Sequence, residues 1–136
     1  MTATLDLDAL HLDDGSHSDR QQGVCLLEAV AWWADEPHDD APVCVSPPLA
    51  AYGRSLNDRL PDARRQELKR FIPLMPGTAG DGQDEERGYL ALDWLIRTYT
   101  PAFLDLRPEL ADVAAELRGL RRIVDLAAAQ AAGPVV

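Results

Sequence analysis

The most hydrophobic stretch of the chain, Val24 to Ala34, contains a single charged residue, Glu28. A later apolar stretch also contains a single charge, Asp93, with Arg97 one helical turn further on. A carboxylate removed from water costs on the order of several kcal/mol unless a cation or hydrogen-bond donors neutralise it. We therefore expect Glu28 and Asp93 to be buried and paired, with Arg54 and Arg97 as the candidate partners.

Arg54 belongs to a second polar group, because Asn57 and Asp58 follow it at a spacing that places all three on one helix face. Two interpretations of the combined cluster stay open. In the first, which we favour, a buried ionic network fixes the packing of the helices. In the second, a polar pocket between helices binds or processes a small ligand. The predicted polar cluster comprises Glu28, Arg54, Asn57, Asp58, Asp93 and Arg97.

Four residues of zinc-binding type lie within a short segment: His17, Cys25, His38 and Cys44. Two thiolates and two imidazoles form a known structural zinc set. The spacing H-x7-C-x12-H-x5-C lacks the closely spaced ligand pairs of common zinc motifs. The prediction is therefore no cofactor, with zinc as the alternative.

Catalysis is a third use of the same residues. Cys25 stands at the start of an expected helix, where the helix dipole lowers a thiol pKa. His38 or His17 could serve as its base, with Glu28 as the orienting acid. Glu28, His38 and Asp40 could also support acid-base chemistry without a cofactor. The chain lacks a phosphate-binding loop, a dinucleotide fingerprint and an HExxH motif. Catalytic residues thus remain unassigned, and the sequence leaves open whether the protein is an enzyme.

The elements that would position these residues are helices. Ser46 followed by Pro47 is a typical helix start, and Asp84 followed by two glutamates is another. The patterns predict helices over residues 23–35, 47–60, 61–72 and 85–99, the fourth capped by Asp84 and interrupted by Pro101. They also predict a last amphipathic helix over 108–132. The predicted fold is an all-α, single-domain bundle of about five helices over 23–132. Residues 1–22 form an irregular acidic segment that could lie extended on the body, and 133–136 form a tail.

Charge is unevenly distributed along the 136 residues, whose net charge is −10. Residues 1–40 contain ten acids and one base, whereas residues 41–136 contain thirteen acids and twelve bases. Such a negative field repels nucleic-acid phosphates and anionic lipids, so we expect no direct nucleic-acid binding and no membrane binding. The basic segment 59–70 is interpreted as a solvated helix face. Two cysteines are too few for a disulfide scaffold, which favours a cytoplasmic location.

The chain resembles a family of small, uncharacterised proteins of actinobacteria and their phages. The resemblance covers about residues 15–106 and rests on the patterns G-x-C-x-x-E-A, H-x-D-x-P-x-C, R-x-x-N-D and R-T-Y-x-P. It implies no activity. Ala41 stands where the resemblance predicts a second histidine, which weakens a metal assignment. The matched positions are Gly23, Cys25, Glu28, His38, Asp40, Cys44, Arg54, Asn57, Asp58, Arg97 and Tyr99.

These observations favour a small acidic cytoplasmic protein that binds a protein partner or regulates it without catalysis. Its partner-binding surface would lie on the acidic N-terminal third, where the paired aspartates at 13–14 and 39–40 are the sole supporting motif. The alternative is a small-molecule-binding or enzymatic domain that uses the Glu/Asp/Arg cluster, with or without zinc. A homo-oligomer is also possible, because the apolar first and fourth helices carry Trp32, Trp33 and Trp94.

Overall fold

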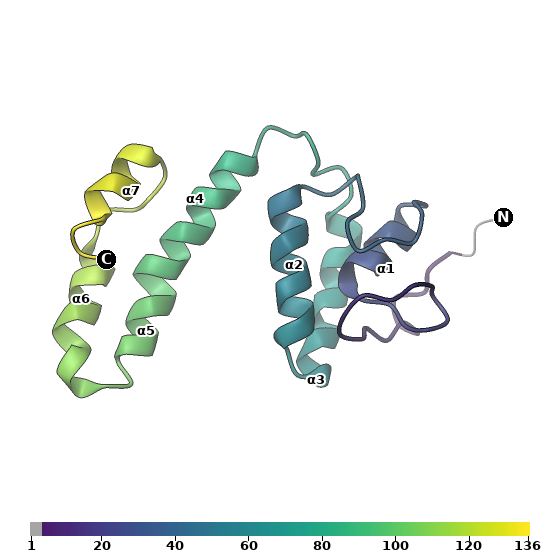
Figure 1. Ribbon diagram of the computed structural model, residues 1–136, viewed down its shortest axis with the longest axis horizontal. Helices are drawn as coiled ribbons and strands as arrows, with labels where there is room; N and C mark the ends of the chain where they lie inside the picture. The colour runs from purple at the N-terminus through teal and green to yellow at the C-terminus, as the bar shows by residue number, and fades with distance from the viewer. Residues whose placement is uncertain (1–3) are drawn as a thin grey trace. The chain divides into compact units, whose positions relative to one another are not determined.

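The computed structural model describes residues 4–136 (Figure 1). The expected all-α fold is confirmed, because residues 4–136 form helices joined by loops and contain no strand. Residues 1–3 of the predicted N-terminal segment lie outside the described part. No helix within the described range combines the length and apolar character that crossing a bilayer requires.

The chain divides into two compact units, Met1–Gln83 and Asp84–Val136. We call them the N-terminal unit and the C-terminal unit. Their boundary falls inside the range 23–132 that was predicted as one helical domain. The segment before it contains Gly77, Gly80 and Gly82, all with positive φ and none with a neighbour that a Cβ would touch. Glycines at positive φ with no contacting neighbour are typical of a surface loop that contributes to neither core.

The N-terminal unit contains α1 (Leu26–Trp33), α2 (Pro47–Arg59) and α3 (Asp62–Arg65), which runs directly into a 3-10 helix, η1 (Gln66–Leu74). The helix α1 is buried on all sides, since every residue from Leu26 to Ala31 is buried, the charged Glu28 included. It packs against η1 and α2. Such a helix requires cover on every side, and the loops must supply the rest.

The N-terminal segment supplies part of that cover, because it lies along the body of the unit, with a turn at residues 7–9 in which the Leu10 N–H donates to the Asp6 carbonyl. Leu5 and Leu12 are buried in the core, and Leu7 and Leu10 pack against its edge. The run of leucines therefore buries apolar side chains on both sides of this turn, and the segment pairs with no strand among the described residues.

Gly53 allows α1 and α2 to approach closely. A Cβ at this position would lie 3.1 Å from a methyl carbon of Leu27 and 3.2 Å from one of Leu26. These distances are shorter than ordinary van der Waals contacts, so a larger residue would push the helices apart.

In the C-terminal unit, α4 (Asp84–Trp94), a π turn η2 (Leu95–Tyr99) and α5 (Thr100–Leu104) form one continuous helix of 21 residues. The prediction that Pro101 interrupts this helix is wrong. Pro101 is buried in the first turn of α5, directly after the π turn. A local change to π geometry is one way in which a helix continues past a proline that cannot donate a backbone hydrogen bond.

The prediction of one helix over 108–132 is also wrong. The structure has a short 3-10 turn η3 (Pro108–Leu110), then α6 (Ala111–Gly119), and after a break α7 (Leu126–Ala132). The helix α6 packs against η2 and α5 (Figure 1). The break begins at Leu120, whose backbone is extended, and ends at Asp125, whose side chain accepts the Ala128 N–H. This aspartate provides a helix start that the apolar spacing alone does not reveal.

Candidate functional site

Glu28 lies in the first turn of α1 and is buried, with 1% of its surface exposed. Its Oε1 accepts the backbone N–H of His17 at 2.6 Å, and its Oε2 accepts that of Cys25 at 2.8 Å. The Nδ1 of His17 lies 2.9 Å from Oε2, and the Nε2 of His38 lies 3.7 Å from Oε1. Burial of Glu28 is as predicted, but its partners are amides and imidazoles, and pairing with Arg54 is wrong.

These contacts keep Glu28 ionised. Burial alone would raise the pKa of its carboxyl group, but hydrogen bonds from the backbone of Cys25 and His17 and from the His17 ring outweigh it and lower the pKa below the ordinary value. The Cys25 N–H is one of the free donors at the start of α1, so Glu28 supplies the glutamate half of a capping box. The buried charge therefore fastens the loop around residue 17 to the start of the helix.

His38 fastens a second loop to the same place. Its Nε2 lies 2.9 Å from the carbonyl oxygen of His17, which requires the proton to be on Nε2. Its Nδ1 is buried without a hydrogen-bond partner.

Gly23 forms the wall against which the His17 ring packs. Its φ is +148°, and a Cβ there would lie 2.6 Å from His17 Nε2 and 2.9 Å from a carboxylate oxygen of Asp13. A side chain at position 23 would therefore displace the imidazole from Glu28. This gives a physical reason for glycine at the first position of the G-x-C-x-x-E pattern.

The two cysteines are protonated thiols. Burial and the nearby Glu28 carboxylate raise the pKa of Cys25 to about 12, so the prediction that the helix dipole activates this thiol is wrong. Burial and Glu36 raise the pKa of Cys44 to about 11. The carboxylate of Glu36 also accepts the backbone N–H groups of Val43 and Cys44.

The zinc alternative does not match the geometry. Within residues 4–136, no three His, Cys, Asp or Glu side chains are placed to hold a metal ion. His17 and His38 direct nitrogen atoms at Glu28 and at a backbone carbonyl, while Cys44 interacts with Glu36. Three of the four predicted ligands, His17, Cys25 and His38, thus meet around Glu28 in structural contacts, and Cys44 contacts Glu36 instead.

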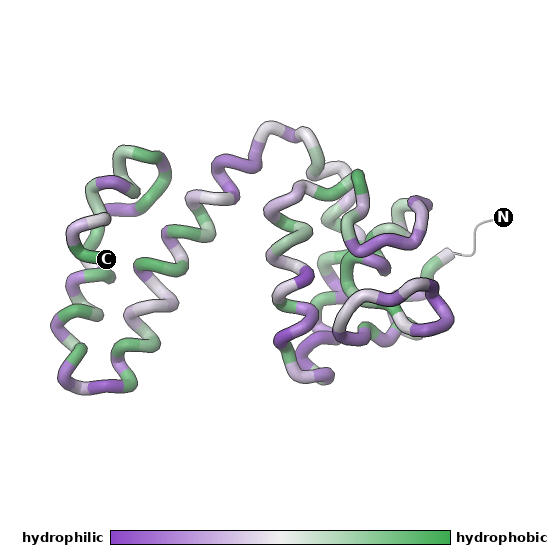
Figure 2. Tube along the Cα trace, viewed as in Figure 1, coloured by the Kyte–Doolittle hydropathy of each residue, from purple (hydrophilic) through white to green (hydrophobic). Residues whose placement is uncertain are grey.

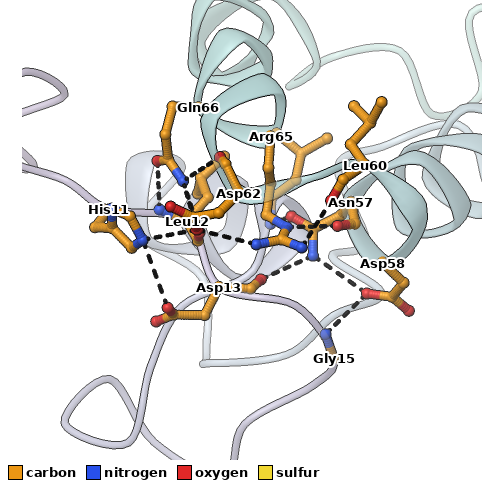
Figure 3. Close-up of polar contacts among 11 residues, drawn as sticks. His11, Leu12, Asp13, Gly15, Asn57, Asp58, Leu60, Asp62, Arg65 and Gln66 are labelled. Atoms are coloured by element: carbon orange, nitrogen blue, oxygen red, sulfur yellow. Dashed lines mark hydrogen bonds and ion pairs between the residues drawn. The ribbon is translucent and has the colours of Figure 1, made fainter.

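Asn57 is completely buried and holds three segments together (Figure 3). Its side-chain oxygen accepts the Leu26 N–H at 3.0 Å, and its nitrogen donates to the Asp13 carbonyl at 2.9 Å and to Asp58 at 3.2 Å. Asp58 also accepts the N–H of Gly15 at 2.8 Å. Asn57 and Asp58, two members of the predicted cluster, thus contact each other and anchor the loop that contains Asp13 and Gly15.

Arg65 and Gln66 extend this network, and sequence reasoning missed both (Figure 3). Arg65 is buried and donates to the carbonyls of Asn57 and Leu60, which α2 leaves free at its end. Arg65 therefore does not belong to the solvated helix face that was predicted for the basic segment 59–70. Gln66 exchanges two hydrogen bonds with the backbone of Leu12, as a neighbouring strand would.

Arg54 does not pair with Glu28, for which it was a candidate partner. Its guanidinium donates to the backbone carbonyl of Asp40 at 3.0 Å. It thereby holds the loop between α1 and α2, in the same manner as Arg65 holds the end of α2.

Asp93 and Arg97 form the predicted ion pair, with 3.0 Å between carboxylate oxygen and guanidinium nitrogen. The carboxylate also accepts the Ile123 N–H at 2.8 Å, across 30 residues. Burial alone would raise the pKa of Asp93, but the Ile123 amide and the Arg97 guanidinium lower it below the ordinary value. This pair belongs to the C-terminal unit and Glu28 to the N-terminal unit, so each unit has its own buried or half-buried carboxylate.

One groove in the N-terminal unit has a volume of about 510 Å³ and runs between the N-terminal segment and α1. The Arg20 guanidinium stacks over the Trp32 ring at its edge, 4.4 Å from the ring centre. Asp13 and Gly23 line it, but no member of the predicted polar cluster does. The ligand-binding interpretation requires a cavity that connects the polar cluster to solvent, and this groove does not provide one.

The continuous helix of the C-terminal unit has an exposed, uncharged face, which we call the outward face. Its large apolar members are well exposed: Leu90 58%, Trp94 47%, Leu95 45%, Tyr99 52% and Phe103 63%. Hydrophobic residues recur along this helix in Figure 2. The outward face comprises Leu90, Ala91, Trp94, Leu95, Thr98, Tyr99, Ala102 and Phe103.

The π turn gives this face its aromatic centre. In a regular α-helix, residues five apart point about 140° away from each other. In η2 the wider turn brings the five-residue pair Trp94 and Tyr99 together, with ring centres 5.2 Å apart. Apart from the nearby Pro101, no feature of the sequence indicates this turn.

Several acids of the N-terminal third organise loops. Asp6, Asp19 and Asp39 each accept the backbone N–H two residues further on. Aspartate commonly closes turns in this way. Together with Glu28 and Glu36, these residues account for half of the ten acids before residue 41.

Comparison of the chain with protein-family models, curated proteins and solved structures finds no match.

Proposed function

We propose that the protein is a non-enzymatic, cytoplasmic protein-binding factor that engages its partner through the outward face of α4, η2 and α5. The exposure of this face carries the proposal. Its eight positions carry no charge, and five of them are large apolar side chains. Contiguous apolar surface of this kind on a soluble chain commonly marks a binding site for another protein.

The composition of the face supports a protein partner. Tryptophan and tyrosine are enriched at the energetic centres of protein interfaces, where they bury a large area with few rotatable bonds. Trp94 and Tyr99 lie at the middle of the face, with Leu90 and Phe103 on either side. This arrangement supports a helix-to-helix mode of binding.

The enzymatic alternative has less support. A general base must come within hydrogen-bond reach of the proton that it removes. Glu28 is 1% exposed and its oxygen atoms already accept hydrogen bonds from His17 and Cys25.

Free thiols at Cys25 and Cys44 support the cytoplasmic location.

The acidic N-terminal third remains a second candidate surface. It retains most of the negative charge, but its acids Asp6, Asp19 and Asp39 are also needed to close turns. The negative field would steer a basic partner without fixing its orientation.

Photo-crosslinking from the outward face tests the proposal. A photoreactive phenylalanine analogue placed at position 103 should form a protein adduct in cells of the native host. The same analogue at Val124, which is 52% exposed but off the face, is the matched control and should form none. Lack of any protein adduct from positions 99 and 103 overturns the proposed function.

A further inference from the structure

We propose that the partner of the outward face is a second copy of this chain, with the two continuous helices packed antiparallel. This inference rests on the proposed function and identifies the occupant of that face. In a twofold dimer the same surface patch is used by both copies, so the patch must match itself. Three features of the face meet this requirement.

The first feature is the symmetry of its side chains about one point. If the twofold axis passes between residues 96 and 97, Trp94 lies opposite Tyr99 of the second copy, and Leu90 lies opposite Phe103. Each aromatic residue then meets another large apolar residue, and no charge from positions 90–104 of the outward face enters the contact. Tightly packed aromatic residues at the centre of the contact would carry most of its energy.

The second feature is the charge at the two ends of the helix. Glu85 and Glu86 are exposed at the start, and Arg107 is exposed just beyond the end. Antiparallel pairing about the same axis places the glutamates of one copy level with Arg107 of the other. Parallel pairing would place the glutamates against themselves, which costs energy through like-charge repulsion.

The third feature is area. Each large side chain of the face, and the following Leu106, has a surface of ~200 Å², about half of which is exposed. Together these side chains offer on the order of 600 Å² of exposed surface per copy. Pairing would bury on the order of 1,200 Å² in total, which reaches the lower limit of stable specific interfaces. Each chain carries a charge of −10, and an uncharged face is where two such chains approach with least repulsion.

Sedimentation of the purified full chain tests the inference. We expect a dimer at micromolar concentration. Leu90→Glu and Phe103→Arg should each weaken dimerisation at least about tenfold, because each places a charge opposite an apolar side chain. Val124→Arg is the matched control and should leave the dimer unchanged, and circular dichroism verifies that every variant folds.

The double variant L90E/F103R tests the antiparallel arrangement. In that arrangement the acid introduced at position 90 of one copy faces the base introduced at position 103 of the other, so the double variant should dimerise more tightly than either single variant. Failure to recover overturns the antiparallel pairing, and a dimer that survives both single substitutions overturns the use of this face. A monomeric wild type overturns the inference, whereas an adduct from position 103 with a different protein leaves the proposed function standing.

Discussion

The two units differ in how their backbone hydrogen-bonding groups find partners. The N-terminal unit has long loops whose backbone groups need partners, and it meets them with buried polar side chains, chiefly Glu28, Asn57 and Arg65. The C-terminal unit is nearly all helix, so its backbone is satisfied internally, and the side chains of Asp93 and Arg97 make its central polar contact. Irregular backbone therefore explains why these polar residues are buried.

The two units also differ in how far they bury their large apolar side chains. The N-terminal unit buries a cluster of large side chains around α1. Within residues 84–136 the buried apolar residues are mostly small or isolated, such as Ala114, Leu117 and Ile123, and aromatic side chains stay exposed. Regular helices without enough loops to cover them leave apolar surface for another chain.

Replacement of Glu28 should have the largest effect. Glu28→Ala leaves two buried backbone N–H groups and the His17 ring without an acceptor, at about 1–3 kcal/mol for each group, so we expect a loss of roughly 3–5 kcal/mol. Hydrogen exchange measured by mass spectrometry should show lost protection in residues 4–83. Glu116→Ala, at an exposed position, is the control. Equal stability of the two variants would refute the role assigned to Glu28.

Asn57→Ala should destabilise the N-terminal unit by about 2–4 kcal/mol, because the Leu26 N–H and the Asp13 carbonyl lose their partner inside the protein. The substitution also leaves a small cavity. Urea denaturation gives the free energy of unfolding. Ser55→Ala, on the exposed side of the same helix, should change it by less than about 0.5 kcal/mol. A similar small change for Asn57→Ala would contradict the anchor role.

Acid should weaken the N-terminal unit through Glu28. Its pKa is lower in the folded state than the ordinary value of 4.5, so its ionised form stabilises the fold above about pH 4.5, and this stabilisation is lost as pH falls through the folded-state pKa. Glu28→Gln lacks this titration. Urea midpoints measured from about pH 6 to about pH 3 should therefore fall less steeply for the variant than for the wild type. Parallel curves would show that Glu28 has the same pKa in both states.

The smallest effect should come from Asp93→Asn. The variant retains an oxygen for the Ile123 N–H and loses the charge that faces Arg97, so we expect a loss of about 1 kcal/mol, confined to residues 84–136. Asp112→Asn, at an exposed position of α6, provides the matched control. Hydrogen exchange separates the two units, and a larger effect in residues 4–83 would contradict this assignment.

Local signals predicted much of the fold. The start of α2 at Pro47 and that of α4 at Asp84 follow from capping residues, and the Asp93–Arg97 pair follows from helical spacing. The isolated charge at position 28 correctly predicted its burial. These features depend on residues within one or two turns of each other, which a sequence displays directly.

The partners of Glu28 could not be predicted in the same way. His17 and His38 reach it from loops, whose paths have no periodicity from which a contact can be inferred. The pattern C-x-x-E from Cys25 to Glu28 did contain a usable signal, since glutamate three residues after a helix cap closes a capping box. Arg65 had no such signal, because its role depends on the free carbonyls of another helix end.

The pairing of Leu12 with Gln66 joins residues 54 positions apart. During synthesis the first segment of the chain emerges long before the glutamine that holds it. The leucines of this segment therefore stay exposed until α3 and η1 have been synthesised. Contacts between residues so far apart in the sequence form slowly. The segment around Leu12 is thus translated before the rest of its unit and is among the last of its parts to reach a fixed position.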